Sequence, residues 1–390
     1  MKKRFRAIAY LIILTVLFTC FSQACFADET EAGRDDSNIH IVITFLGDCT
    51  LGAVESDYES PRSFIAYAEN NGLGYFFSEV QSVLANDDLT IANLESVFSD
   101  DSSTRARNKT YCFRAPVSYA EMLNLASIEA VSFGNNHSMD YGVSGALSTV
   151  AALEGVGVDW FGTNPDYTTN QYPEGISKPW IYEKDGVKIG FVASYISAWW
   201  IKAVEYGEEY KIQKTQVEEL KAQGCDLIIA CMHGGVEYDR LHDSNQENFA
   251  NAYFEYGADI VIGNHPHRLQ GMTVDEKGTV CYSLGNFCFG GNKRIHVGAE
   301  TTCIFQFDFE FDPESHTYLG YTLTLYPAVP GSFVDEEYTD YQPKLVNGKE
   351  AESILYEIQR DTRPRTLKLN PYIDGIGAVQ EFVPNPKLNR

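Results

Sequence analysis

Residues 130–140 read Ala-Val-Ser-Phe-Gly-Asn-Asn-His-Ser-Met-Asp, and this stretch sets the pattern of the fold. The run 130–133 is apolar and rich in β-formers, which predicts a buried strand. It passes directly into the turn 134–137, whose Asn136 and His137 place an amide and an imidazole at the strand end. Ser138 to Asp140 then lead into the next helix-like stretch.

Four other strand-like runs also end in polar groups that bind metals, namely 39–46 before Asp48, 89–93 before Glu95, 226–231 before His233 and 259–262 before His265. Stretches whose apolar residues recur every three or four positions separate them, at 75–86, 117–126, 142–154, 211–223 and 244–256. Strands that alternate with helices predict an α/β fold with a parallel or mixed sheet. Functional groups of such a sheet gather beyond the carboxyl ends of its strands, so we expect these side chains to share one site.

The remaining pattern sets expectations for turns and domains. Asp185-Gly186 and the segment 276–278 predict hairpin turns. Ser244, with Glu247 three residues later, predicts the capping box of the helix 244–256.

After the β-rich runs 301–311 and 318–327 the periodicity weakens. We therefore predict one domain over 39–334 and a peripheral extension over 335–390.

The N-terminus has the three parts of an export signal. Four basic residues precede the apolar stretch 7–21, and Cys25-Phe26-Ala27 offers a cleavage site. We interpret 1–27 as a signal peptide and 28–38 as a linker. The alternative is a retained anchor, because the apolar run approaches the ~17 to 25 residues that span a bilayer. Either reading predicts an exported protein, outside the cell or at its surface.

Composition restricts the partners. The chain has 390 residues, 44% of them hydrophobic, which excludes wholesale disorder. Its net charge is −24, and loss of 1–27 would leave 54 acidic against 26 basic side chains. Such a surface is poorly suited to nucleic acid, so an anionic substrate has to be attracted locally. Seven cysteines follow residue 27, an odd number without a C-x-x-C spacing, which predicts buried free thiols.

An ordered set of short motifs resembles the bacterial CapA family of capsule synthesis proteins. The motifs are Gly47-Asp48, Asn93-Leu94-Glu95, Asn135-Asn136-His137 with Asp140, the segment 233–238 (His-Gly-Gly-Val-Glu-Tyr), the segment 263–267 (Gly-Asn-His-Pro-His) and the segment 282–287 (Tyr-Ser-Leu-Gly-Asn-Phe). The resemblance spans 39–327. It implies a role in the production or export of poly-γ-glutamate, with an anionic envelope polymer and membrane polymer-synthase subunits as partners.

The same motifs are similar to the calcineurin-like metallophosphoesterase pattern, which implies a four-layer αββα sandwich with mixed sheets and a centre for one or two divalent ions, such as Mn, Zn or Fe. The metal ligands that it implies are Asp48, Glu95 as the bridging carboxylate, Asn136, His233, His265 and His267. His137 would be the catalytic imidazole beside them. Pro266 lies between His265 and His267 and is expected to keep the backbone extended there, so that both histidine side chains point the same way.

Two positions depart from the family patterns. Thr50 stands where phosphoesterases usually have a histidine, and Asn264 stands where CapA proteins usually have one. The first change removes a strong ligand from one metal position. We therefore expect one tight metal, or one tight and one weak.

Several residues carry two interpretations. Asp140 orients His137 or caps the helix near Gly142. Glu237 is a general base or a surface carboxylate. The basic loop, defined as Arg105, Arg107, Lys109 and Arg114, binds an anionic substrate or faces water.

Two functions follow. His137 favours an exported metal-dependent hydrolase of a phosphoester, or of an amide or ester in an envelope polymer. The replacement of the usual histidine by Thr50 favours a second function, that of a non-catalytic factor that binds or guides a polyanionic chain.

Overall fold

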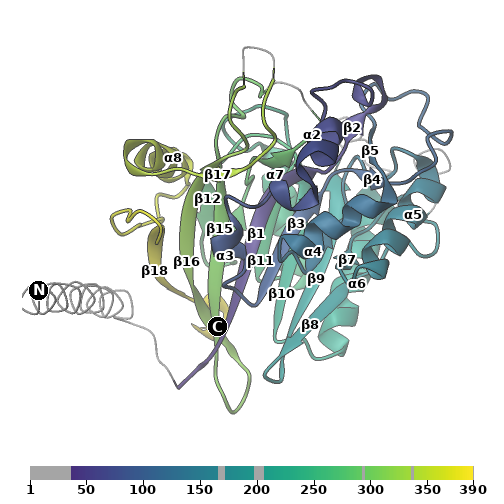
Figure 1. Cartoon of the computed structure of the whole chain (residues 1–390). Coiled ribbons are helices and arrows are strands. Elements are labelled where there is room, and N and C mark those ends of the chain that lie inside the picture. Colours follow the sequence, from purple (N-terminus) through teal and green to yellow (C-terminus); the bar gives the residue numbers. More distant parts are fainter. Residues whose placement is uncertain (1–36, 166–171, 197–205, 292–294, 335–337, 390) are drawn as a thin grey trace, which may run out of the picture. The chain divides into compact units, whose positions relative to one another are not determined.

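The computed structural model describes residues 37–165, 172–196, 206–291, 295–334 and 338–389. Ile39–Arg390 form one compact unit (Figure 1). The predicted signal peptide, 1–27, and most of the linker lie outside the described residues. In the described ranges, no helix has both the length and the apolar character to cross a membrane.

The first sheet has nine strands in the described part of the chain, with β1 near its centre. Their order is β17 (Lys344–Leu345), β16 (Tyr318–Val329), β15 (Thr302–Phe311), β1 (Ile39–Thr50), β3 (Leu89–Leu94), β6 (Ala130–Ser132) and β7 (Asp159–Phe161), with β14 (Asn286–Phe289) beside β1 and β18 (Ala378–Pro384) beside β16. The strand β1 runs parallel to β3 and antiparallel to β15, so the sheet is mixed. Successive side chains of β1 point to opposite faces of the sheet, so Ile41, Ile43 and Phe45 share one buried face.

The second sheet has the order β12 (Met272–Val274), β13 (Thr279–Cys281), β11 (Ile260–Asn264), β10 (Leu227–Gly234), β9 (Val187–Ile196) and β8 (Trp180–Lys184). The predicted hairpins join β8 to β9 and β12 to β13. Asp185 and Gly186 both have positive φ, as a two-residue hairpin turn requires. A small third sheet consists of β2 (Ala53–Val54), β5 (Phe113–Ala115) and β4 (Val97–Phe98).

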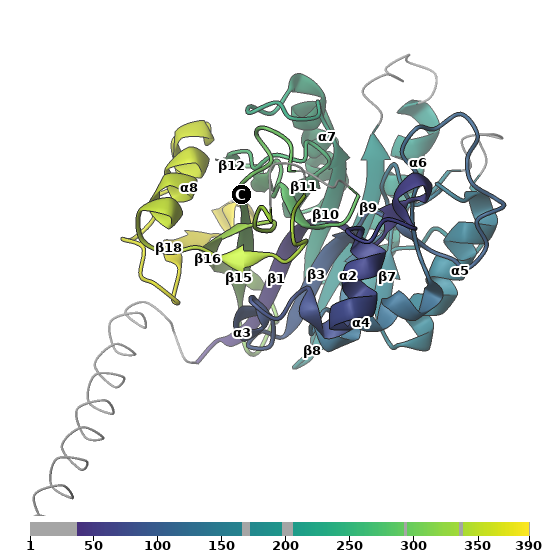
Figure 2. The same ribbon diagram turned by 45° about the horizontal axis from the view of Figure 1, so that its top comes forward.

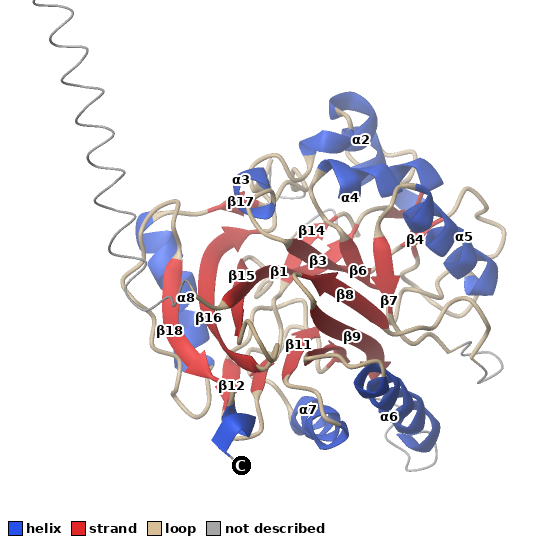
Figure 3. Ribbon diagram, turned by 90° about the horizontal axis from the view of Figure 1, so that it is seen from below, coloured by secondary structure: helices blue, strands red, loops and turns tan. Residues whose placement is uncertain are grey.

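Helices cover the outer face of each large sheet (Figures 2 and 3). The first sheet packs against α2 (Phe64–Asn71), α3 (Gln81–Leu84), α4 (Glu121–Leu125) and α5 (Gly142–Gly155), and the second against α6 (Tyr206–Ala222) and α7 (Ser244–Tyr256). Between the sheets lies an apolar core in which Phe45 and Phe307 belong to one sheet and Phe191 and Ile262 to the other. The predicted αββα sandwich is confirmed.

Two local predictions are wrong. The stretch 75–86 is not one helix but the 3₁₀ turn Leu73–Tyr75, further turns and the short α3, because buried residues three or four apart fit consecutive turns as well as a helix. The cap of α7 is Asp243 rather than Ser244. Its carboxylate accepts the N–H of Gln246, whose side chain in turn accepts the N–H of Asp243.

The segment after residue 334 belongs to the same body and is not peripheral. The strand β18 pairs with β16, and α8 (Gly348–Asp361) buries Ile354 and Ile358 in the core between the sheets. At the end of α8, Asp361 forms an ion pair with Arg240, in the loop that follows β10. The apolar residues of α8 recur at helical spacing, so the sequence does carry a signal for this helix.

Candidate metal centre

The predicted ligands come together where the carboxyl ends of strands from both sheets meet. Asp48 lies at the end of β1, Glu95 directly after β3, and His233 near the end of β10. Asn136 follows β6, and the two remaining histidines follow β11. Nearly all of these side chains are buried. The expectation of a single site at this edge is met by the geometry.

Four of the donor atoms form a first ligand group, defined as Asn136 Oδ1, His233 Nε2, His265 Nδ1 and Glu95 Oε1. The His233 nitrogen lies 2.9 Å from the Asn136 oxygen, 3.1 Å from the His265 nitrogen and 3.4 Å from the Glu95 oxygen. Four ligands about 2.0–2.1 Å from one tetrahedral ion stand about 3.3 Å apart. The residues present therefore fit a divalent metal.

A second ligand group lies on the other side of Glu95. It is defined as Asp48 Oδ2, His267 Nδ1 and Glu95 Oε2, with the nitrogen 3.1 Å and 3.9 Å from the two oxygens. Ligand atoms of Glu95, His265 and His267 all lie within 4.8 Å of one another. Glu95 is thus placed to bridge two metal positions.

Glu95 gives a separate reason to expect that this centre binds a cation. Its carboxylate is fully buried, and neither oxygen has a hydrogen-bond partner among the described residues. Burial alone would raise the pKa of this carboxyl, but His267 and His233 outweigh it and lower the pKa below the ordinary value. A buried, ionised carboxylate without hydrogen bonds is costly unless a positive charge faces it.

A layer of amides holds the ligands in place. The Asn93 amide donates to Asp48 Oδ1 at 2.8 Å, and the same nitrogen lies 3.2 Å from His233 Nδ1. Asn135 donates to Asn93 Oδ1 and to the carbonyl of Leu94, and accepts the N–H of His137. Both asparagines belong to motifs visible in the sequence, but only the sheet register shows what they contact.

The backbone around the paired histidines is unusual. His265 and His267 have φ values of 100° and 55°, so the predicted extended conformation around Pro266 is wrong. His265 faces His233, whereas His267 faces Asp48. Such rare conformations concentrate at functional sites, where the surrounding structure holds them. Here the strain directs the two imidazoles to different ligand groups.

His137 stands beside the first ligand group with two partners of its own. Its Nδ1 lies 2.8 Å from Asp140 Oδ2 and 3.1 Å from the Lys109 ammonium, while its Nε2 lies 3.8 Å from Glu95 Oε1. Asp140 is buried and also accepts from Lys109 and from the N–H of Phe113. The cap interpretation of Asp140 is wrong, because α5 begins without a side-chain cap.

The basic loop does not act as one surface. Arg105 donates to the backbone carbonyls of Lys109 and Thr110, and buried Arg114 donates to the carbonyl of Ser99. Arg107 is exposed. Lys109 contacts the metal centre, where it donates to Asp140 and, at 2.6 Å, to the Asn136 carbonyl. The sequence shows the four charges but not which of them the fold uses internally.

Glu237 lies exposed in the loop after β10. Its negative charge acts on His267, whose pKa it helps to raise. Its assignment as a general base stays a prediction.

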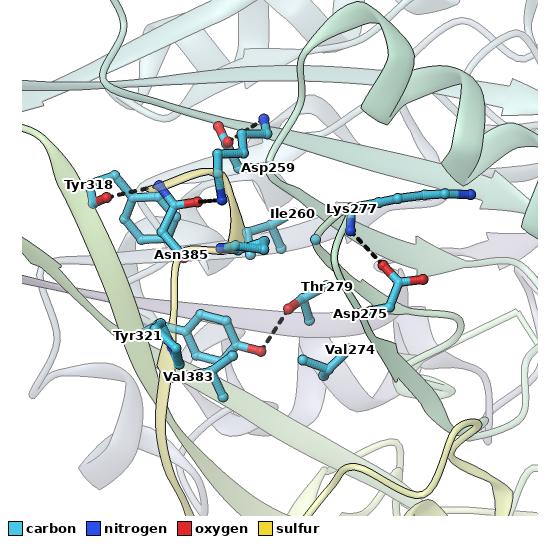
Figure 4. Close-up of a pocket in the computed structure, with 14 residues that line it drawn as sticks. Asp259, Ile260, Val274, Asp275, Lys277, Thr279, Tyr318, Tyr321, Val383 and Asn385 are labelled. Atoms are coloured by element: carbon cyan, nitrogen blue, oxygen red, sulfur yellow. Dashed lines mark hydrogen bonds and ion pairs between the residues drawn. The ribbon is translucent and has the colours of Figure 1, made fainter. Parts of the chain in front are cut away.

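A small pocket lies away from this centre, at the amino ends of β11, β13 and β16 (Figure 4). Its polar groups satisfy one another. Tyr321 and Thr279 hydroxyls are 2.7 Å apart, Lys387 pairs with Asp259, and Asn385 donates to the carbonyl of Tyr318. These internal contacts give no reason to assign the pocket a ligand.

Metal binding is expected to strengthen as pH rises. Burial lowers the pKa of His267, but Glu95 and Asp48 raise it further, to about 10 in the metal-free protein. Because a metal ligand must be unprotonated, a proton has to leave His267 at every pH below that value. We expect the affinity for Zn²⁺ to rise by up to about tenfold per pH unit between pH 6.5 and 8.5. Calorimetry in buffers of different ionisation enthalpy would count the released protons, and a pH-independent affinity would contradict the prediction.

The fold and the site define an α/β protein with helices outside two packed mixed sheets and a buried cluster of candidate metal ligands at the strand ends. A family comparison narrows this class. The chain belongs to the family described as bacterial capsule synthesis protein PGA_cap, which matches residues 42–291. The predicted resemblance is confirmed.

Individual relatives agree with this family. The chain is 26% identical over 303 residues to the capsule biosynthesis protein CapA of Bacillus anthracis, covering 74% of this chain and 69% of the relative. It is 26% identical over 300 residues to the PGA biosynthesis protein CapA of Bacillus subtilis, covering 74% and 72%. A solved structure of a phosphatase from Mycoplasma pneumoniae matches 74% of this chain and 94% of its own, with 16% identity and a TM-score of 0.46.

Proposed function

We propose that this protein takes part in capsule or poly-γ-glutamate biosynthesis as a metal-dependent hydrolase of the phosphoesterase type. The observation that carries the proposal is the His137–Asp140 pair beside the ligand groups. His137 is not needed to complete either group, and a purely structural metal site has no use for an oriented imidazole next to it. The family supports the polymer role, and the donor set supports the metal.

The chain's own residues then have distinct tasks. Divalent ions in the two ligand groups would supply positive charge for a developing oxyanion and lower the pKa of water. Asp140 holds the Nδ1 side of His137, so that Nε2 faces the centre and can pass a proton to a leaving group. Lys109 fixes Asp140 and the Asn136 carbonyl, which keeps the turn 136–140 in position.

The substrate is proposed to be an anionic envelope polymer such as poly-γ-glutamate, or a phosphoester. The chain as a whole has a net charge of −24, so an anionic substrate has to be attracted by positive charge close to the site. The metal centre and Lys109 are the cationic features at the strand ends that serve this purpose. Membrane polymer-synthase subunits are the proposed partners, and nucleic acid is not.

Replacing His137 by alanine should separate metal binding from catalysis. We expect His137→Ala to keep its metal content but to lose activity towards a generic aryl phosphodiester by about 10²–10⁴-fold, the usual contribution of a general acid. Metal content would be measured by mass spectrometry in the samples used for kinetics. His316→Ala, in the turn between β15 and β16, is the matched control and should retain activity.

The alternative is a non-catalytic factor that binds or guides the polymer. Thr50 favours it, because this residue stands where phosphoesterases usually have a histidine, and its hydroxyl accepts the N–H of Gly291 at 2.7 Å. Metal-loaded protein that binds poly-γ-glutamate, yet cleaves neither the polymer nor the phosphodiester, would establish this alternative and contradict the hydrolase.

Export is part of the proposal and rests on the pattern of residues 1–27. Fractionation of cells that express the full chain, with a variant in which the basic residues before the apolar stretch are replaced, would test it. Retention of the unaltered chain inside the cell would contradict export.

A further inference from the structure

The second ligand group is short of one donor. The first group has four donor atoms, whereas the second has only Asp48, Glu95 and His267. Thr50 offers only a neutral hydroxyl, which already accepts the N–H of Gly291 and is a weaker donor to a metal than the histidine usual at this position. A further oxygen donor lies on β14, the strand beside β1.

Asn286 begins β14 and pairs with Asp48 in parallel register, so both side chains project from the same face of the sheet. It is 5% exposed. Its Oδ1 lies 2.9 Å from His267 Nδ1, the same nitrogen that stands 3.1 Å from Asp48 Oδ2 and 3.9 Å from Glu95 Oε2. Three oxygens therefore surround one ring nitrogen.

This arrangement exceeds what one imidazole N–H can satisfy. If Nδ1 of His267 carries a proton, that proton can be donated well to only one of the three oxygens. If Nδ1 carries none, its lone pair faces all three oxygens. A cation among the four atoms satisfies all of them. The buried carboxylate of Glu95 also favours a cation here, because neither of its oxygens has a hydrogen-bond partner among the described residues.

We propose that Asn286 is a ligand of the second metal position, where its amide oxygen completes a set with Asp48, Glu95 and His267. The two positions then differ in chemistry. The first offers two imidazole nitrogens and two oxygens, whereas the second offers one nitrogen and three oxygens. Oxygen-rich sets favour Mn²⁺ or Mg²⁺, and imidazole favours Zn²⁺ or Fe²⁺. We infer a mixed centre with a harder ion at the second position.

The test counts metal directly and rests on the metal centre, not on the hydrolase activity. The full chain is stripped with a chelator and dialysed against Mn²⁺, Zn²⁺ or both, and bound ions are measured by mass spectrometry. We expect two ions in the wild-type chain. In Asn286→Ala we expect one ion at unchanged affinity and the other weakened at least about tenfold.

A second variant separates ligation from mere support of His267. Asn286→His replaces the oxygen donor by a nitrogen, so it should shift the second position from Mn²⁺ towards Zn²⁺. A residue that only orients His267 would weaken binding without changing this preference. Asn385→Ala, which removes a buried asparagine of the pocket in Figure 4, is the control and should keep two ions.

The outcomes are distinct. Two ions at full affinity in Asn286→Ala, or an unchanged Mn²⁺ to Zn²⁺ preference in Asn286→His, would overturn the assignment of Asn286 while leaving the metal centre intact. Absence of metal from the wild-type chain would overturn the centre and this inference together. Two ions bound without hydrolysis would support Asn286 and count only against the proposed activity.

Discussion

Replacing Glu95 by glutamine is expected to abolish tight binding at both metal positions. Each oxygen of Glu95 belongs to one ligand group, so a single change removes negative charge from two sites. Removal of a supporting contact alone costs about 10–100-fold in metal affinity, and loss of a bridging ligand should exceed that range. Glu95→Gln keeps the volume of the side chain, so steric disruption does not explain the loss.

Thermal unfolding gives this prediction a second readout. Metal at 100 times its Kd stabilises the wild-type fold by about 2.7 kcal/mol, whereas Glu95→Gln should gain almost nothing from the same concentration. The two proteins should therefore differ in Tm mainly when metal is present. Glu69→Gln, exposed on α2, is the control and should respond to metal like the wild type. Equal stabilisation of Glu95→Gln by metal would refute a bridging role.

Gly263→Ala is expected to destabilise the fold and the metal centre together. A Cβ atom at Gly263 would lie 2.1 Å from the carbonyl oxygen of Tyr282, which is backbone and cannot turn aside. Overpacking of this kind costs about 1–3 kcal/mol or more, and we expect the upper end because two strands must separate. The displaced segment leads directly into His265, so metal affinity should fall as well.

Denaturant unfolding and metal dialysis would measure both effects. Gly155→Ala, at the end of α5, is the matched control, since a Cβ there meets nothing within 4 Å. Its free energy of unfolding should stay the same or rise by up to about 1 kcal/mol, because alanine is the better helix former. A Gly263→Ala variant as stable as Gly155→Ala would show that the two strands tolerate separation.

The alternation of strands and helices predicted a mixed sheet, and the sandwich followed only from the resemblance to a known family. Most of the candidate ligands were predicted for a physical reason. Each ligand follows an apolar run, and parallel strands bring their carboxyl ends to a common edge. Asp48, Glu95, Asn136, His233 and the paired histidines were therefore recognisable before their distances were known. Asp140 was harder to assign, because an aspartate before a helix looks the same whether it caps the helix or holds an imidazole.

The remaining features depend on contacts that no local pattern reveals. Asn286 is 238 positions from Asp48 in the chain and becomes its neighbour only through the register of β14 and β1. Arg114 looks like its basic neighbours until the fold buries it. The positive φ values at His265 and His267 oppose the extended geometry expected around proline, and tertiary contacts decide them.

The candidate ligands come from both sheets, which has a consequence for when the metal centre can form. The His265 backbone N–H that contacts Asp48 is 217 residues away from it along the chain. Contacts so distant form late in folding, after the loops between them have closed. Neither ligand group is complete in a partly made or unfolded chain. Any ion that these two ligand groups hold can therefore be bound only after both sheets of the sandwich have come together.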